Sequence, residues 1–153
     1  MDTIPDDLSG LYDDGHIQCV VISYGDGHRD APTGSAMLVD ARPLPNPVED
    51  PEVRESVLHA TGLDREVRRY VMATPRARRL VRQGAEQVLL LLRADSLGRW
   101  AGGQRSRVDV HVVCEGGKYQ SVAVAEEIAA YLRAAGVGCE TEHRHIDRPL
   151  LAA

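Results

Sequence analysis

A cysteine, two glycines and a lysine stand where a valine-rich, strand-like run gives way to a helix-like run. The segment reads Cys114-Glu115-Gly116-Gly117-Lys118-Tyr119-Gln120-Ser121. The first N–H groups of a helix lack acceptors within the helix and carry partial positive charge, so such a turn attracts anions. Gly116 and Gly117 let the backbone approach a ligand closely, while Lys118 adds a cation and Ser121 a hydroxyl. The segment predicts a phosphate-binding loop; a plain strand-to-helix turn is the alternative.

A cysteine at the head of such a loop could also be a nucleophile. In cysteine-dependent phosphatases the thiolate attacks phosphorus, and an arginine six positions later holds the phosphate oxygens. The sixth residue after Cys114 is Gln120, which is uncharged and cannot replace a bidentate guanidinium. The sequence therefore favours a non-catalytic binding module, and a phosphatase-like enzyme that uses Cys114 is the alternative.

Charge is distributed unevenly along the chain, whose formal net charge is −5. Residues 1–64 carry 13 acidic and 3 basic residues, whereas residues 65–107 carry 11 arginines and 3 acidic residues. The middle segment is therefore the only part on which an anionic polymer could dock. A basic face for RNA is one interpretation, and a solvated surface that pairs with the acidic N-terminal region is the other. The candidate RNA contacts are Arg65, Arg68, Arg69, Arg76, Arg78, Arg79, Arg82 and Arg144.

Composition argues against several other classes of protein. Phenylalanine is absent and aromatic residues make up 4% of the chain, so a stacking platform for single-stranded nucleic acid is not expected. Cys19, Cys114 and Cys139 are too few and too scattered for a disulfide framework or a four-thiolate zinc site. His143 and His145 have no third metal ligand at a clear spacing, so we expect them to be surface or edge-strand residues. We expect no metal and no cofactor.

The N-terminus is acidic and lacks the basic and apolar regions of a signal peptide. The longest apolar run, residues 88–92, is far too short to span a membrane. The sequence therefore predicts a cytoplasmic protein with no membrane partner.

These residues must be positioned by an alternation of strands and helices. Apolar β-branched runs predict strands over 16–24, 36–40, 107–114 and 138–145. Periodicity and capping predict helices over 52–60, 64–73, from 75 onward, and 122–135, with a loose Gly-rich loop over 96–106. The pattern favours a single α/β domain over 16–148, with a mostly parallel sheet flanked by helices. Residues 1–15 are predicted to be a flexible acidic arm and 149–153 a tail. Ligands of such sheets bind at the carboxyl ends of strands, where Asp40 and Cys114 stand.

Three ordered motifs, spread over most of residues 17–145, resemble the C-terminal domain of the RNase adapter protein RapZ. The stretch 40–47 is similar to the family's D-V-R-x-L-P-N-P, and 61–64 with Val67 and Tyr70 is similar to T-G-L-D-x-x-V-x-x-Y/F. Residues 114–126 are similar to C-T-G-G-x-H-R-S-V-x-x-A-E, and His143-Arg144 falls where the family has H-R. The P-loop domain that usually precedes this one has no counterpart in the 153 residues, so nucleotide hydrolysis is not expected.

The resemblance implies a dimeric α/β domain that senses glucosamine-6-phosphate and binds a small regulatory RNA as an adapter for a ribonuclease. It does not imply an enzyme. It implies a sugar-phosphate pocket with Asp40, Cys114, Gly116 and Gly117. Arg42 would support the loop through ion pairs; alternatively, Asp40 and Arg42 form a structural pair that fastens the proline-rich segment.

The chain departs from the family at several ligand positions. Tyr119 and Gln120 replace a His-Arg pair, and Val48 stands where a His or Tyr can face the ligand. The nearest candidate for the family's basic contact after the first strand is His28. Loss of one such contact weakens binding by about 1.5–3 kcal/mol. We therefore expect either a related anion, such as an amino-sugar phosphate or a nucleotide, or a decayed pocket in a protein-interaction domain.

Overall fold

The computed structural model of the chain describes residues 16–98 and 107–151. The predicted arm over 1–15 lies outside the described residues, as does most of the predicted Gly-rich loop. The helical segments are the short 3₁₀ turns η1 (Asp26–His28) and η2 (Pro47–Glu49), and the helices α2 (Arg54–Val57), α3 (Arg65–Val71), α4 (Pro75–Gly98) and α5 (Gln120–Ala134). The strands are β1 (Cys19–Gly25), β2 (Met37–Asp40), β3 (Val110–Cys114) and β4 (Cys139–His143).

The four strands form one sheet in the order β2-β3-β1-β4, and every neighbouring pair is parallel. This confirms the predicted single α/β domain with a mostly parallel sheet. Val21 of β1 pairs with Val110 of β3, and Cys19 pairs with Cys139 of β4. Because all four strands run the same way, their carboxyl ends meet at one edge of the sheet.

Helix α4 begins where the sequence predicts, because Thr74 and Pro75 mark its start. The Thr74 Oγ1 accepts a hydrogen bond from the Ala77 N–H at 3.2 Å, which satisfies one of the N–H groups that a helix start leaves unpaired. The predicted end was wrong: α4 continues to Gly98, and the loop was predicted to begin at 96. The reason is that no Gly or Pro interrupts residues 85–97, so nothing stops the helix earlier.

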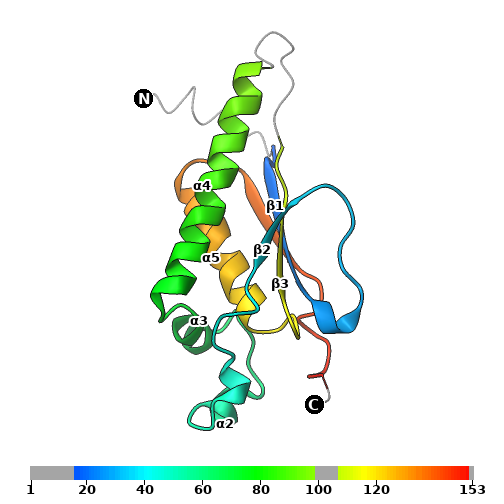
Figure 1. The fold of residues 1–153 in the computed structure, drawn as a ribbon, viewed down its shortest axis with the longest axis vertical. Coiled ribbons are helices and arrows are strands. Elements are labelled where there is room, and N and C mark those ends of the chain that lie inside the picture. Colours follow the sequence, from blue (N-terminus) through cyan, green and yellow to red (C-terminus); the bar gives the residue numbers. More distant parts are fainter. Residues whose placement is uncertain (1–15, 99–106, 152–153) are drawn as a thin grey trace.

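Helix α5 covers the sheet and α4 packs on α5 (Figure 1). Ile128 and Leu132 of α5 are fully buried against the strand residues Val21 and Val112. Cys19 and Cys139 are buried free thiols. The opposite face of the sheet is more exposed to solvent: Leu38 of β2 points away from the helices and is 62% exposed.

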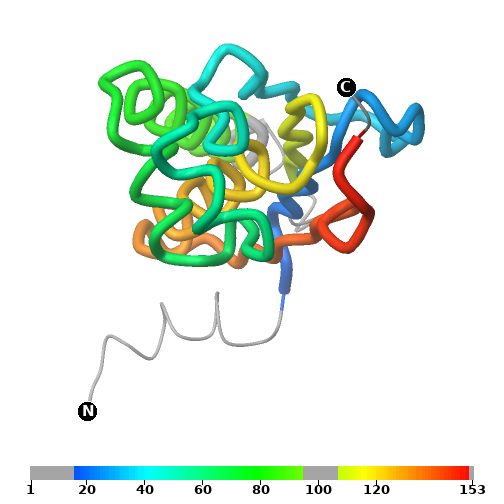
Figure 2. Tube along the Cα trace, turned by 90° about the horizontal axis from the view of Figure 1, so that it is seen from below, coloured from blue at the N-terminus to red at the C-terminus, as the bar shows by residue number. Residues whose placement is uncertain are grey.

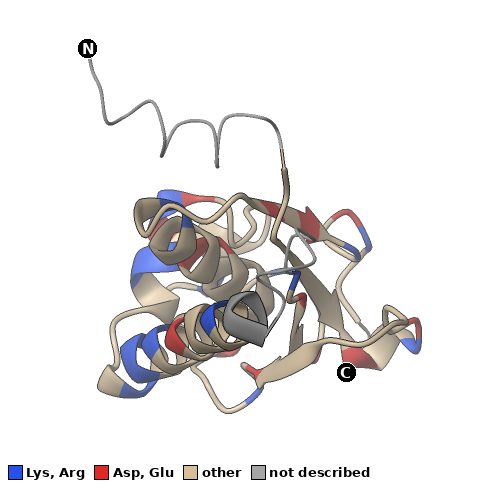
Figure 3. Cartoon of the chain, turned by 90° about the horizontal axis from the view of Figure 1, so that it is seen from above, with Lys and Arg blue, Asp and Glu red and all other residues tan. Residues whose placement is uncertain are grey.

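Positive charge is concentrated along α4 and its neighbouring helical turns (Figure 3). The seven arginines predicted to form a basic face lie on α3 and on the first two turns of α4, and all but Arg68 are exposed. None of the helices within the described ranges is long and apolar enough to cross a membrane.

The carboxyl edge of the sheet is where the predicted site residues converge. Figure 2 looks onto this edge and shows the loop after β3 surrounded by the segments that follow β1, β2 and β4. Backbone hydrogen bonds join them: the Gly27 N–H donates to the Glu115 carbonyl at 2.9 Å, and the Gly62 N–H to the Lys118 carbonyl at 2.8 Å.

Candidate functional site

The loop Cys114–Ser121 is built by close contact between backbones. Gly117 has φ of +74°, and a Cβ added there would lie 2.6 Å from the Gly25 nitrogen. A Cβ on Gly25 would in turn meet the Gly116 carbonyl carbon at 2.4 Å. Gly25 and Gly117 are therefore glycines because no side chain fits. Gly116 differs, since an added Cβ would meet no heavy atom within 4 Å, so this part of the loop faces open space.

The thiol of Cys114 is turned into this loop. Its Sγ accepts a hydrogen bond from the Gly117 N–H at 3.2 Å and donates to the Ser121 Oγ at 3.1 Å. Cys114 is 1% exposed and Ser121 is fully buried. The two side chains thus fix the curvature of the loop where it enters α5, and the sulfur has no open path to a ligand.

Tyr119 and Gln120, which replace the family's His-Arg pair, point into the protein. The Tyr119 hydroxyl donates to the Val57 carbonyl at 3.0 Å, and the Gln120 Nε2 donates to the Leu44 carbonyl at 3.4 Å. Their exposed fractions are 3% and 6%. Both side chains therefore fasten neighbouring segments to the start of α5 and do not face solvent.

Asp40 and Arg42 form a tight pair at the end of β2. The Arg42 Nε and Nη2 donate to the two Asp40 carboxylate oxygens at 2.9 and 3.0 Å. These bonds lower the pKa of Asp40 and raise that of Arg42. The Arg42 Nη1 also lies 3.6 Å from the Asp26 Oδ2. Since β3 lies between β2 and β1, this contact with Asp26 carries Arg42 from the end of β2 toward the end of β1, at the same edge of the sheet from which the glycine loop follows β3.

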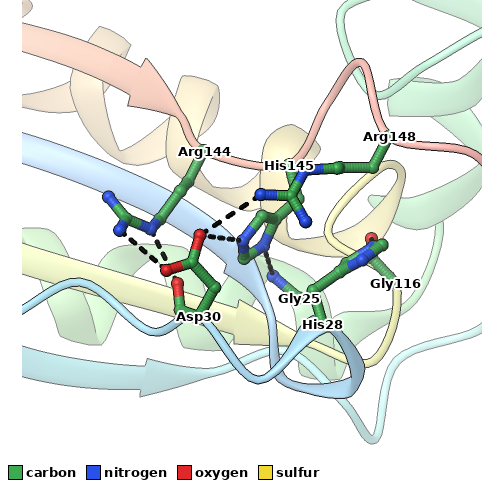
Figure 4. Close-up of polar contacts among 7 residues, drawn as sticks. All are labelled: Gly25, His28, Asp30, Gly116, Arg144, His145 and Arg148. Atoms are coloured by element: carbon green, nitrogen blue, oxygen red, sulfur yellow. Dashed lines mark hydrogen bonds and ion pairs between the residues drawn. The ribbon is translucent and has the colours of Figure 1, made fainter.

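A buried histidine anchors the loop from the other side (Figure 4). His145 is fully buried, and its Nδ1 accepts a hydrogen bond from the Gly25 N–H at 2.8 Å. A backbone N–H can only donate, so Nδ1 carries no proton and the Nε2–H faces Asp30 Oδ2 at 3.3 Å. The His28 ring lies 4.7 Å from the His145 ring, and His28 Nε2 donates to the Gly116 carbonyl at 3.1 Å.

Asp30 forms ion pairs with the arginines of the C-terminal segment (Figure 4). Arg144 donates to its carbonyl and to its carboxylate at 2.7 and 3.0 Å, and Arg148 reaches the carboxylate at 3.3 Å. The bond from Arg144, and then that from His145, lowers the pKa of Asp30. The Lys118 ammonium donates to the Ile146 carbonyl at 2.8 Å. The segment after β4 is thereby fastened to both flanking loops.

Ser23, His143 and Glu126 form a hydrogen-bonded chain under α5. The His143 Nδ1 lies 2.6 Å from the Ser23 Oγ, and its Nε2 lies 2.7 Å from the Glu126 Oε2. These are residue types of a hydrolase triad, but Ser23 is fully buried within β1, where no substrate reaches it. These hydrogen bonds join β1, β4 and α5, so the three side chains have a structural role.

The prediction of surface or edge-strand positions is confirmed for His143, which lies on β4, and is wrong for His145, which follows β4 and is fully buried. β4 is an edge strand, but both imidazoles are largely or wholly buried and bonded. The reason is that α5 covers His143 and that the chain turns inward after β4, which places His145 against Gly25. Among the described residues no group of three or more His, Cys, Asp or Glu side chains could hold a metal ion.

Comparison with known proteins agrees with this architecture. The RapZ C-terminal domain matches residues 17–147. The chain belongs to the RapZ C-terminal domain family. A protein of Salinispora tropica named nucleotide-binding protein is 36% identical over 143 residues, which cover 94% of this chain and 44% of that protein. Similarly named proteins of Parafrankia sp. and Streptomyces coelicolor are each 38% identical over 132 residues, covering 86% of this chain and 42% and 41% of theirs. The chain spans less than half the length of these relatives.

The predicted site residues of this RapZ C-terminal domain fall into two groups. Asp40, Arg42, Glu115, Gly116 and Lys118 reach the surface of the carboxyl edge, whereas the other predicted loop residues are buried. Sequence reasoning missed Asp26, Asp30, His145 and Arg148. The pair His143-Arg144, which resembles the family's H-R, pointed to the segment, but no pattern in the sequence indicated that the acidic partner of Arg144 would come from the loop after β1.

Proposed function

We propose that this RapZ C-terminal domain is a non-catalytic binding module that recognises a phosphorylated small molecule at the carboxyl edge of its sheet. The observation that carries the proposal is the open backbone at Gly116, at the same edge of the sheet as the exposed guanidinium of Arg42. Gly116 leaves room for a ligand to touch the main chain, and Arg42 is 47% exposed. Backbone groups and a guanidinium are the usual partners of a phosphate.

The alternative, a cysteine-dependent phosphatase, is less consistent with the site. A nucleophilic thiolate must face the phosphorus atom, but the Cys114 Sγ is enclosed by Gly117 and Ser121. No guanidinium stands at position 120. Phosphatase activity with p-nitrophenyl phosphate is expected to be absent from the wild type and unchanged in Cys114→Ser. Activity that disappears in Cys114→Ser would overturn the non-catalytic proposal.

The ligand class follows from the surface groups of the site. The Asp40 Oδ2 accepts only one of the three bonds from Arg42 and can therefore also accept from a sugar hydroxyl or amine. An amino-sugar phosphate or a nucleotide offers both a phosphate and such donors, and the relatives carry the name nucleotide-binding protein. With Tyr119 and Gln120 turned inward, the phosphate would rely on the loop backbone and Arg42.

The test is a thermal-shift assay with glucosamine-6-phosphate, other sugar phosphates, nucleotides, and inorganic phosphate and sulfate. A ligand that binds only the folded chain stabilises it by RT ln(1 + [L]/Kd), about 2.7 kcal/mol at a hundredfold excess over Kd. Gly116→Val should abolish the shift without lowering the Tm of the free chain, because its side chain enters open space. If no compound shifts the Tm at millimolar concentration, the pocket has decayed and the proposal fails.

RNA is a second candidate partner, favoured by the exposure of six of the seven clustered arginines on α3 and α4. Such binding would rest on phosphate contacts and fall steeply with salt. An electrophoretic mobility assay at about 50 and 200 mM salt, with Arg79→Glu as the variant, tests it. Equal binding by Arg79→Glu and wild type would contradict an RNA face. A ribonuclease partner and a homodimer are further parts of the adapter proposal.

A further inference from the structure

A surface groove on the helical side of the molecule shares no lining residue with the glycine loop. Its volume is about 480 Å³, which lies within the range of ligand sites in proteins. It is formed by the turn before α3, by one face of α3 and by α5. The lining residues are Leu63, Arg65, Arg68, Arg69, Met72 and Glu127.

On its α3 side, the groove is lined by a stripe of residues along one face of that helix. Arg65, Arg68, Arg69 and Met72 are spaced i, i+3, i+4 and i+7, so their side chains are neighbours. The opposite face of α3 is buried through Val67 and Val71, which fixes the stripe toward the groove.

Positive charge in the groove is only partly neutralised. The Arg68 Nη2 lies 3.1 Å from the Glu127 Oε2, and this is the one carboxylate in the lining. Within residues 16–98 and 107–151, neither Arg65 nor Arg69 forms an ion pair or a side-chain hydrogen bond. The acidic residue of α3, Glu66, instead accepts from the Ser56 hydroxyl at 3.2 Å. Like charges at i,i+4 repel one another, so an anionic occupant would relieve a repulsion that the fold leaves in place.

The groove also presents apolar surface. Leu63 is 50% exposed, and it is held outward by a rigid turn. The Leu63 N–H donates to the Thr61 Oγ1 at 3.1 Å, and the Thr61 N–H donates to the Asp64 Oδ2 at 2.7 Å. Leu63 and Met72 stand at the two ends of α3, before Arg65 and after Arg69, so the groove has apolar surface on either side of the guanidinium groups. A phosphate backbone would use the arginines but not this apolar surface.

We propose that the groove binds an acidic peptide segment of a partner protein, with carboxylates on Arg65 and Arg69 and apolar side chains against Leu63 and Met72 at the two ends of the groove. Charge complementarity selects the carboxylates, and the exposed leucine selects a hydrophobic residue beside them. Arginine and methionine are also enriched at protein interfaces, and arginine is a frequent hot-spot residue. This site is additional to the proposed phosphate-binding loop.

The test uses a fluorescein-labelled peptide, Glu-Asp-Leu-Glu-Asp-Leu-Glu, and a second peptide with both leucines replaced by serine. Fluorescence anisotropy at low salt should show saturable binding of the leucine peptide with a Kd on the order of 100 μM. Arg69→Glu should weaken it at least about tenfold, whereas Arg93→Glu, an equal charge change at an exposed position of α4 outside the groove, should change it less than about twofold. The serine peptide should bind several times more weakly.

The variant Leu63→Ser tests the contribution of the apolar contact to binding without changing the charge of the groove. In this variant the difference in affinity between the leucine and serine peptides should become smaller, because Met72 is then the only part of the proposed apolar contact that remains. The proposal is overturned if the leucine peptide does not saturate at about 1 mM, if Arg93→Glu weakens it as much as Arg69→Glu, or if wild type binds both peptides equally. It is also overturned if a single-stranded RNA of equal charge binds more tightly than the peptide and loses affinity in Arg69→Glu but not in Leu63→Ser.

Discussion

At the scale of single residues, His145 shows how a buried imidazole can be held in one protonation state. Its Nδ1 accepts from the Gly25 N–H, and a proton on that nitrogen would face the N–H directly. Burial, and then the neighbouring His28 and Arg148, lower its pKa below the ordinary value of 6.5, while Asp30 acts in the opposite direction. The His145 ring is therefore neutral in the folded chain at neutral pH.

The first prediction concerns pH. The unfolded chain protonates His145 near its ordinary pKa, while the folded chain resists until the pH is lower. The stabilisation is thus fully present above about pH 6.5 and is lost as the pH falls toward the folded pKa. The free energy of unfolding, measured by urea denaturation from pH 8 to pH 5, should decrease below pH 6.5.

His145→Asn is the matched variant for this prediction. The Asn Oδ1 can accept from the Gly25 N–H in place of the imidazole Nδ1, but it does not titrate. The variant should be less stable at pH 8, where the contact with Asp30 is missing, and should depend less on pH between 6.5 and 5. Parallel pH profiles for variant and wild type would show that another group is responsible.

At the scale of elements, the loop after β3 depends on its glycines in different ways. Gly117 requires both a left-handed backbone and the absence of a Cβ, because Gly25 lies 2.6 Å from where that atom would be. Gly34 has φ of +98° but no heavy atom within 4 Å of an added Cβ. A comparison of Gly34 with Gly117 therefore distinguishes the cost of backbone strain from the cost of steric overlap.

The second prediction uses that pair. Gly34→Ala should lower the free energy of unfolding by about 1 kcal/mol, the cost of a left-handed alanine. Gly117→Ala should lower it by about 2–4 kcal/mol, since overpacking of a filled site adds to the same strain. Urea denaturation of both variants measures the difference. A Gly117→Ala variant as stable as Gly34→Ala would mean that the loop can move away from β1.

The elements themselves were largely predictable, whereas their side-chain partners were not. Apolar periodicity placed all four strands and the helices α3 to α5, because each buries a regular face. The helix predicted from residue 64 is α3, but the carboxylate of Asp64, which precedes it, caps no helical N–H and accepts from the Thr61 N–H. Tyr119 was expected near a ligand and is buried against Val57. Such outcomes depend on which loops meet at the sheet edge, which local patterns do not encode.

At the scale of the whole molecule, the two faces of the sheet are unequal. Helices cover one face, while Leu38 on the other face is 62% exposed. Leu90 on α4 is 57% exposed and lies on the helical side. An exposed leucine on an uncovered sheet face is where a second copy of the chain would gain most by burial.

The third prediction follows from the proposed homodimer. Leu38→Lys should convert a dimer into a monomer in sedimentation equilibrium, because a lysine cannot be buried there without loss of its hydration. Leu90→Lys, a similar change at a similarly exposed site, should leave the assembly unchanged. A monomeric wild type, or equal effects of the two variants, would show that the open sheet face is not the dimer contact.

The strand order β2-β3-β1-β4 also determines when the chain can fold as a ribosome makes it. β1 emerges first, but both of its partners, β3 and β4, lie in the last third of the chain. The helix that covers the sheet, α5, is also made late. Until β3 has left the exit tunnel, neither β1 nor β2 has a neighbouring strand, and their valines stay exposed until α5 follows. Non-local pairing of this kind is slow and leaves apolar segments open to aggregation. The nascent chain is therefore the form of this protein with the greatest need of a chaperone.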